Sequence, residues 1–340
     1  MTSKKVLLTG ISGWLGKHTA IELLKSGYSV IGTVRNKELI ESTKDTLSKY
    51  TSLDNLSFTQ IDLLEEGWDK ITLGCDYVVH MASPFPIKVS NDPNHLLPAA
   101  KDGTLRVLKA AIKNDVKQII LTSSLVAMFR QPNRSNPYSV GENDWSDVNW
   151  KKGMSDYFLS KTVAEKAAWD FMKSKGFKER LTTINPGGVF GDALDKKGGT
   201  SIEYAKQFLK GKFPAAPKWG VLISHANDVA KSHVACLGNT NVAGRRLIVG
   251  KEVKTLLELS NMMAEVAPEY AKKLPKKELP NFMVKLFSYL DSSAKTMIPD
   301  LELTMHVDTS YAEKLLDIKF QTAKESISDM TKSVIRLGMA

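Results

Sequence analysis

Cysteine is scarce in this 340-residue chain, which contains only Cys75 and Cys236. Two thiols cannot build a disulfide framework or a cysteine-rich metal site in a chain of this size, and their scarcity favours a reducing compartment. We therefore expect a cytoplasmic protein. The six histidines show neither H-x-x-x-H nor H-E-x-x-H spacing, so no catalytic metal is expected.

Long apolar runs are also absent. The longest one, around 119–129, is short and contains hydroxyl residues, so it predicts no membrane span. The apolar stretch after Lys4 and Lys5 is soon interrupted by glycine and serine, which argues against a signal peptide. The formal net charge of +10 would suit a nucleic acid or a membrane surface, but the lysines are scattered among acids. We expect a solvated basic surface and neither of these partners.

A glycine-rich turn follows the first apolar segment. Residues 5–9 predict a strand and 21–24 continue an apolar helical face, so the order is strand, turn, helix. The turn between them is Gly10-Ile11-Ser12-Gly13-Trp14-Leu15-Gly16, with G-x-x-G-x-x-G spacing. Such spacing lets backbone approach a pyrophosphate at a helix N-terminus. A nucleotide-triphosphate P-loop would need glycine at Ile11 and serine or threonine at His18, so we set that alternative aside.

Strands and helices continue to alternate along the first half of the chain. Apolar segments at 28–34, 56–61, 75–80 and 118–122 predict strands, and 99–114 predicts a helix. This alternation predicts an α/β fold with a parallel sheet covered on both faces and ligands at the carboxyl ends of the strands.

The residue after the second strand bears on the choice of cofactor. An acid there would bind a ribose 2′-hydroxyl and favour NAD, whereas this chain has Arg35. A guanidinium suits a 2′-phosphate, so NADP is favoured. The alternative is an ordinary solvent-facing arginine.

Tyr157 and Lys161 stand four residues apart in a predicted helix and so share one face. A phenol with a pKa of about 10 is a poor proton donor near neutrality, and a nearby ammonium is expected to lower that pKa. Taken alone, such a pair usually lies on a surface. Ser124, at the end of the strand over 118–122, adds a hydroxyl on the side of the sheet where ligands bind.

The motifs VLLTGISGWLG, Asp62-Leu63, VVHMASP, LTSS, YFLSK and NPGGVFG resemble the extended short-chain dehydrogenase/reductases in order and spacing. The branch that the chain is most similar to contains dihydroflavonol 4-reductase, cinnamoyl-CoA reductase and the fungal carbonyl and methylglyoxal reductases. The resemblance extends through 224–238 and 307–320, and so covers nearly the whole chain. Two departures separate it from the sugar-nucleotide enzymes of the family. Residues 100–104 lack the N-x-x-G-T pattern, and Leu125-Val126-Ala127 stand where dehydratases carry acids.

This resemblance implies a Rossmann-type doubly wound parallel sheet with a smaller C-terminal α+β substrate lobe. It assigns 1–191 and 221–251 to the NADP-binding domain, and 192–220 and 252–340 to the substrate lobe. The implied catalytic set is Ser124, Tyr157 and Lys161, with NADP(H) as cofactor. The implied cofactor contacts are Gly10, Ser12, Gly13, Trp14, Leu15, Gly16, Arg35, Asp62, Leu63, Met81, Ala82, Ser83, Thr122, Ser123, Tyr157, Lys161, Pro186, Gly187, Gly188 and Val189.

We therefore expect an NADPH-dependent reductase of aldehydes or ketones, with Tyr157 as proton donor to a small-molecule carbonyl substrate. The alternatives are an NAD-dependent sugar-nucleotide epimerase or dehydratase, and a non-catalytic dinucleotide-sensing module. Family members often dimerise, and composition leaves monomer and homodimer both open. Candidates by position for the substrate pocket are mostly apolar or aromatic, although about half of them would serve equally well as core: Phe85, Pro86, Met128, Phe129, Phe158, Phe190 and Trp219.

Two further interpretations concern residues outside this set. His80, His225 and His233 are expected to be hydrogen-bonded structural groups rather than catalysts. The amphipathic stretch 281–299, with Phe282 and Leu286, is expected to pack its apolar side against the rest of the lobe.

Overall fold

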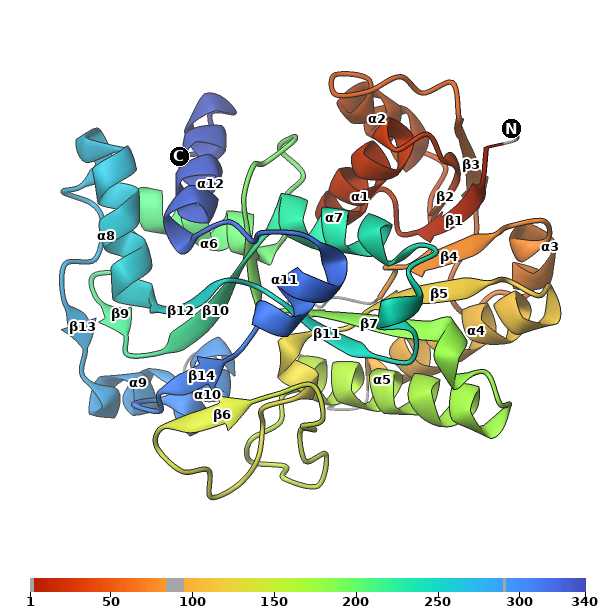
Figure 1. Cartoon of the computed structure of the whole chain (residues 1–340). Helices are drawn as coiled ribbons and strands as arrows, with labels where there is room; N and C mark the ends of the chain where they lie inside the picture. Colours follow the sequence, from red (N-terminus) through yellow and green to blue (C-terminus); the bar gives the residue numbers. More distant parts are fainter. Residues whose placement is uncertain (1–2, 84–94, 290–291) are drawn as a thin grey trace.

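A seven-stranded parallel sheet forms the centre of the protein (Figure 1). The structure is a computed structural model that describes residues 3–83, 95–289 and 292–340. The strand order is β11-β7-β5-β4-β1-β2-β3, and each neighbouring pair is parallel. The strands are β1 (Lys5–Thr9), β2 (Ser29–Val34), β3 (Leu56–Gln60), β4 (Tyr77–His80), β5 (Gln118–Thr122), β7 (Leu181–Pro186) and β11 (Arg246–Val249). The predicted α/β fold is confirmed.

The strand order changes direction at β1. The chain runs outward through β2 and β3 on one side of β1 and then returns to place β4 on the other side. Thr9 is aligned with His80, so the carboxyl ends of β1 and β4 meet at one edge of the sheet. In doubly wound sheets a ligand crevice opens at this point, because the two connections leave in opposite directions.

Alternate residues of each strand pack into two different cores. Val6 and Leu8 of β1 face one cluster, and Leu7 between them faces the other. Full burial of such a side chain contributes about 1.5–3 kcal/mol. The first core is covered by α1 (Trp14–Lys25), α2 (Leu39–Leu47), α7 (Ala226–Cys236) and α11 (Ser310–Leu316). The second is covered by α3 (Trp68–Thr72), α4 (Gly103–Lys113) and α5 (Asp156–Ser174), of which α5 lies below the sheet in Figure 1.

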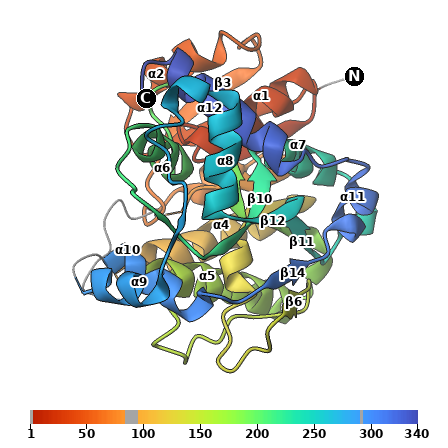
Figure 2. The same cartoon turned by 90° about the vertical axis from the view of Figure 1, so that its left-hand side faces the viewer.

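A smaller lobe is built on a three-stranded sheet with the order β12-β10-β8. Its strands are β8 (Gly188–Phe190), β10 (Gly220–His225) and β12 (Glu252–Thr255). Its core lies between this sheet and α6 (Thr200–Leu209), α8 (Leu256–Val266) and α12 (Ala323–Arg336). Figure 2 looks onto the lobe, with α8 in front of β10. Capping boxes start α8 at Thr255 and α12 at Thr322, which satisfies backbone N–H groups at both helix starts.

Short elements complete the lobe and the connections. Two-stranded sheets pair β6 (Tyr138–Val140) with β14 (Met305–Val307), and β9 (Ala216–Pro217) with β13 (Glu278–Leu279). Two short helices follow, α9 (Asn281–Phe287) and α10 (Ser292–Met297). Single turns of 3₁₀ helix are Leu125–Ala127, Lys178–Arg180, Thr240–Val242, Pro268–Tyr270 and Ile298–Asp300, and Pro98–Asp102 is a π-helical turn.

Two sequence interpretations change in the structure. The helix predicted over 99–114 begins with the π-helical turn, and α4 starts at Gly103. The expected packing of 281–299 is wrong for its first part: Phe282 is 70% and Leu286 62% exposed, while Val284 is buried. The apolar side of α9 therefore faces outward. None of the helices in the described part of the chain is long and apolar enough to cross a membrane.

The division into two domains stays a prediction, and some elements lie across its proposed boundaries. The strands β8 and β10 lie in segments assigned to the first domain, apart from Gly220, but β10 pairs with both β8 and β12, and β12 belongs to the segment assigned to the lobe. The helix α11 belongs to the segment assigned to the lobe, but its Ala312 and Leu316 pack in the first core of the main sheet.

Candidate active site

The glycine turn brings backbone close together at the start of α1. Gly10 has φ +75°, a left-handed conformation that favours glycine. A methyl group on Gly16 would lie 2.2 Å from the carbonyl oxygen of Gly10, so only glycine fits there. The helix begins after Gly13 without a side-chain cap and without an acid in its first turn. Its first N–H groups and its dipole therefore favour an anion at this end.

A threonine and a histidine fix the loop that leaves β4. The Thr9 hydroxyl accepts hydrogen bonds from the backbone N–H groups of Met81 (3.0 Å) and Ala82 (2.9 Å). Its own proton is then free to be donated to His80 Nδ1 at 2.8 Å. A methyl group on Gly10 would approach Ala82 Cα to 3.0 Å, so this loop also packs against the glycine turn. The predicted structural role of His80 agrees with these contacts.

The residues predicted to contact the adenosine part of the cofactor lie at the ends of β2 and β3. Ile61 N–H donates to the Val34 carbonyl at 3.0 Å, so Arg35 and Asp62 follow paired strands. Arg35 is exposed. Asp62 Oδ1 accepts the backbone N–H of Leu64 at 3.0 Å. Leu63 packs against Gly103, where an added methyl would lie 2.8 Å from its Cβ.

The three predicted catalytic residues come from two neighbouring elements. Ser124 follows β5, and Tyr157 and Lys161 lie in the first turns of α5, which Ser155 caps through the N–H of Phe158. A hydrogen bond links Ser124 and Tyr157. Lys161 Nζ donates to the Thr122 carbonyl at 3.4 Å. The structure thus brings the three residues together at the carboxyl end of β5.

The pKa of the Tyr157 phenol differs from what the sequence suggests. The sequence suggests that Lys161 lowers the pKa of Tyr157, but burial raises this pKa to about 12, and the opposing influence is the hydrogen bond with Ser124. The net shift is therefore opposite to the predicted one. Burial also lowers the pKa of Lys161 to about 8, and the Glu165 carboxylate opposes that shift.

Glu165 was missed by the sequence reasoning, although it lies one helical turn after Lys161. Its carboxylate is buried and accepts hydrogen bonds from the hydroxyl of Ser123, the amide of Asn185 at 2.8 Å and Nε of Arg246 at 2.6 Å. Burial alone would raise the pKa of Glu165, but Arg246 and these hydrogen bonds outweigh it and hold the pKa below its usual value. The extended pattern Y-x-x-x-K-x-x-x-E would have indicated this residue.

The hydroxyl groups of Thr122 and Ser123 already have partners inside the protein. Thr122 Oγ1 lies 2.6 Å from His233 Nε2, whose Nδ1 lies 2.7 Å from the Val229 carbonyl. Ser123 donates to Glu165. Some of their backbone groups are engaged as well, because the Ser123 N–H donates to the Ile184 carbonyl at 2.8 Å and the Thr122 carbonyl accepts from Lys161. The indole of Trp14, another predicted contact, donates to the Asp192 carbonyl at 2.9 Å.

The segment after β7 is held against β10. Gly187 N–H donates to the hydroxyl of Ser224 at 2.9 Å, and this hydroxyl donates to the Val249 carbonyl at 2.6 Å. A methyl group on Gly187 would lie 2.2 Å from the Leu222 carbonyl oxygen. The Ser124 hydroxyl lies 3.5 Å from the Pro186 carbonyl. The predicted stretch from Pro186 to Val189 therefore begins beside Ser124.

The predicted substrate residues have different surroundings. Phe85 and Pro86 lie outside the described residues. Met128, Phe129 and Phe158 are buried in one apolar cluster against which Tyr157 packs. Phe190 and Trp219 are half-buried, and Phe190 packs on the lobe core. Their part in binding a substrate stays a prediction.

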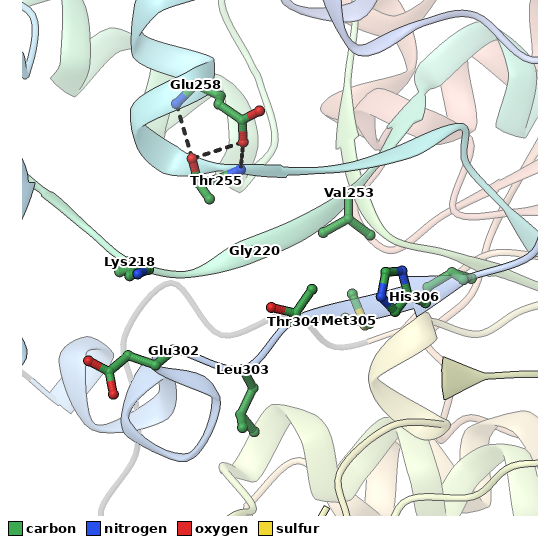
Figure 3. A pocket seen from close by; sticks show the side chains of 11 residues that line it. Lys218, Gly220, Val253, Thr255, Glu258, Glu302, Leu303, Thr304, Met305 and His306 are labelled. Carbon is green, nitrogen blue, oxygen red and sulfur yellow. Dashed lines mark hydrogen bonds between the residues drawn. The ribbon is translucent and has the colours of Figure 1, made fainter. Parts of the chain in front are cut away.

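A groove of about 360 Å³ opens elsewhere in the lobe (Figure 3). Val253 points from β12 towards β14. The opposite wall is lined by Met305 and His306 of β14 and by Thr304 just before them, and Lys218 lies at one end of the groove. Of the predicted catalytic and substrate residues that the structure describes, none lines it. Val253 and Met305 nevertheless belong to the apolar cluster behind Tyr157.

Comparison with known proteins gives concordant matches. The family model described as "NAD dependent epimerase/dehydratase family" matches residues 6–250. Cinnamoyl-CoA reductase 1 of Arabidopsis thaliana is 28% identical over 98% of this chain and 90% of its own length. Tetraketide alpha-pyrone reductase 1 of the same plant is 30% identical over 98% of this chain and 96% of its own. The crystal structure of yeast methylglyoxal/isovaleraldehyde reductase Gre2 complexed with NADPH matches with a TM-score of 0.80 at 25% identity, covering 99% and 100% of the two chains.

Proposed function

The chain belongs to the NAD dependent epimerase/dehydratase family, on the reductase branch of the extended short-chain dehydrogenases, and we propose that it reduces an aldehyde or ketone to an alcohol with NADPH. The observation that carries this proposal is the contact between Ser124 and Tyr157 beside Lys161, at the carboxyl end of the parallel sheet. Two hydroxyl groups placed together can both hydrogen-bond one carbonyl oxygen.

The residues present fit a dinucleotide. Gly10 and Gly16 carry no side chains and lie close together. The backbone at the uncapped start of α1 can therefore approach a pyrophosphate. Arg35 at the end of β2 is exposed and offers its guanidinium to a 2′-phosphate, which favours NADP over NAD. The solved Gre2 structures from yeast and Candida albicans are described as complexes with NADPH. When bound, the cofactor supplies the hydride.

Tyr157 and Ser124 would act together on the substrate oxygen. With a pKa of about 12, the Tyr157 phenol carries its proton at neutral pH and can donate it to that oxygen as negative charge develops there. Ser124 would donate a hydrogen bond to the same oxygen and stabilise this charge. The Lys161 ammonium, with its pKa of about 8, is largely charged at neutral pH and supplies positive charge beside both hydroxyls.

We propose an apolar or aromatic carbonyl compound as the substrate class. Support comes from the cluster of Met128, Phe129 and Phe158, which packs beside Tyr157 and surrounds the site with apolar surface. A nucleotide sugar would require basic partners for its diphosphate, and the guanidinium groups that pack on this cluster, those of Arg130 and Arg134, are already paired with Asp300. A competition assay in which UDP-sugars block the reaction better than aromatic ketones do would overturn this part of the proposal.

The test is consumption of NADPH with an aromatic aldehyde, followed by the absorbance of the reduced nicotinamide. We expect net oxidation by the wild type and a loss of about a hundredfold or more in turnover for Tyr157→Phe and for Ser124→Ala. Tyr50→Phe removes a hydroxyl beside α2, away from these residues, and serves as the matched control with wild-type turnover expected.

The same assay separates the alternatives. An epimerase or dehydratase would consume no cofactor overall, and a sensing module would bind NADPH without turnover. A Tyr157→Phe protein that kept most of its turnover would refute the proposed role of the phenol.

A further inference from the structure

We propose that Glu165 is a positioning residue, whose buried carboxylate holds the strand end that carries Ser124 and the ammonium of Lys161 in their working arrangement. This inference rests on the proposed reductase function. Glu165 touches neither of the reacting groups directly, so its role would be exerted through Ser123, Asn185 and the charge of Lys161.

The carboxylate joins separate parts of the fold. One oxygen, Oε2, accepts from the hydroxyl of Ser123 after β5 and from the amide of Asn185 in β7. The other, Oε1, accepts from Arg246 of β11 at 2.6 Å and from Thr183 of β7 at 3.1 Å. Because Glu165 itself lies on α5, these hydrogen bonds fix the catalytic helix against three neighbouring strands.

The hydrogen bond between Glu165 and Asn185 also connects Glu165 to Ser124. The same amide nitrogen that donates to Glu165 lies 3.2 Å from the Ser124 carbonyl oxygen and donates to it as well. Ser123, next in the chain, donates its hydroxyl to the same carboxylate oxygen. Removal of the carboxylate would leave the Ser123 hydroxyl without this acceptor and the Asn185 amide nitrogen with the Ser124 carbonyl alone, which would loosen the backbone around the Ser123–Ser124 peptide.

The charge of Glu165 acts on Lys161 as well. The two residues are one helical turn apart on α5, and the ammonium is buried. Burial disfavours the charged lysine, and Glu165 is the group that opposes this effect by favouring the charge. Loss of the negative charge would therefore allow Lys161 to lose its proton at a lower pH.

Arg246 compensates the buried carboxylate from the opposite side. Its NH1 donates to the carbonyl groups of Glu142 at 2.9 Å and Asp144, and its guanidinium stacks 3.7 Å from the ring centroid of Trp145. The carboxylate is therefore paired and hydrogen-bonded, as a buried charge must be. The cost of this buried ion pair is consistent with a functional rather than a purely stabilising role.

The central experiment compares wild type with Glu165→Gln, which keeps the size of the side chain and removes its charge. We expect kcat to fall about tenfold to a hundredfold, because a small displacement of Ser124 is costly to the reaction. We also expect the alkaline limb of the pH profile of kcat/KM to move about one pH unit lower, because Lys161 loses its favourable neighbour. A side chain with only a structural role would not move this limb.

Three further variants separate position from charge. Glu165→Asp keeps the charge and should restore the alkaline limb while kcat stays reduced. Ser123→Ala removes one link but leaves the carboxylate, so kcat should fall without a shift of the limb. Asp170→Asn makes the same acid-to-amide change at an exposed position of α5, so it is the matched control with both quantities unchanged. Circular dichroism identifies any variant that does not fold.

A second readout does not depend on turnover. Cofactor fluorescence gives the affinity for NADPH as a function of pH without substrate, and the weakening at alkaline pH should begin about one unit lower in Glu165→Gln. Suppose that the wild type is active and that the folded Glu165→Gln protein has the same kcat and the same pH dependence. That result would overturn the role of Glu165 but not the proposed function. A wild type that binds NADPH but reduces no carbonyl compound would overturn the proposed function, and the binding profiles would then decide the role of Glu165.

Discussion

Acidification should destabilise the fold well before the carboxylates titrate, because two buried histidines are held neutral. The Thr9 hydroxyl donates to His80 Nδ1, and His80 Nε2 lies 3.3 Å from Thr104 Oγ1, so the ring suits the neutral Nε2–H form. His233 uses the other neutral form, with Nδ1–H donating to Val229 and Nε2 accepting from Thr122. Burial lowers the pKa of His80 to about 3, with a further contribution from the charge of Lys161, and burial lowers that of His233 to about 4.

The sign and size follow from proton linkage. In the unfolded chain both rings have a pKa of about 6.5 and take up protons below that pH, while in the folded chain they stay neutral. The unfolded state therefore gains stability as the pH falls from about 6.5 towards about 4. Between pH 7 and pH 5.5 each ring removes about 1.3 kcal/mol from the free energy of unfolding, so the pair removes about 2.5 kcal/mol. This is a large share of a typical total of about 5–15 kcal/mol.

His18 is left out of this sum for a structural reason. Burial lowers its pKa to about 4 as well, but both ring nitrogens face oxygen atoms, Asn227 Oδ1 at 2.8 Å and the Asp192 carbonyl at 3.0 Å. Two acceptors suit a ring that carries two protons, so this site resists protonation less than the other two.

The measurement is the free energy of unfolding from urea titrations at several pH values between 7 and 5.5. His80→Asn offers its Oδ1 in place of Nδ1 as acceptor for Thr9 and carries no titrating ring, so its dependence on pH should be about half as steep. A wild-type free energy that is flat over this range, or a variant as steep as the wild type, would refute the reasoning.

Three other substitutions test the site and its support. Gly16→Ala would place a methyl 2.2 Å from the Gly10 carbonyl oxygen, and NADPH affinity measured by fluorescence should fall about tenfold or more; unchanged affinity would contradict the placement of the pyrophosphate. Arg35→Ser should lower the preference for NADPH over NADH, the ratio of their kcat/KM values, by roughly 10- to 100-fold, and an unchanged ratio would identify Arg35 as an ordinary surface residue. Lys17→Met removes the partner of Asp195 in an ion pair whose lysine is 2% exposed. The free energy of unfolding in urea should therefore fall by about 3 kcal/mol, and an unchanged urea midpoint would count against a stabilising role of this pair.

Five strands of the central sheet, β1 to β5, were predicted because the sequence marks them, whereas β7 and β11 were not among the predicted strands. β1 and β5 lie at the predicted positions, since their apolar runs end at Gly10 and at the hydroxyl pair Ser123-Ser124. The two-residue strands β9 and β13 were not predicted, because a segment this short carries no periodicity. The outward apolar side of α9 was also missed, because an amphipathic pattern does not say whether a partner surface is present.

The grouping of the residues proposed as catalytic was predictable by spacing, but their electrostatics were not. Positions i and i+4 of a helix place Tyr157 and Lys161 on one face whatever surrounds them. The pKa of Tyr157 depends instead on burial, which the rest of the fold supplies and which acts more strongly than the hydrogen bond with Ser124. Arg246 and Asn185 reach Glu165 from strands far along the chain. Only the pairing of β5, β7 and β11 brings them together.

The helix that follows the glycine turn also explains why a lysine stands directly after Gly16. In a nucleotide-triphosphate P-loop that lysine would reach the phosphates, but here Lys17 is buried and pairs with Asp195, which also accepts from Thr46 at 2.8 Å. Trp14 and His18 contact the same loop through the Asp192 carbonyl. The side chains of α1 therefore bind the connection that leads into the lobe, and the backbone of the turn is left for the anion. These contacts join the start of α1 to the connection that leads into the lobe.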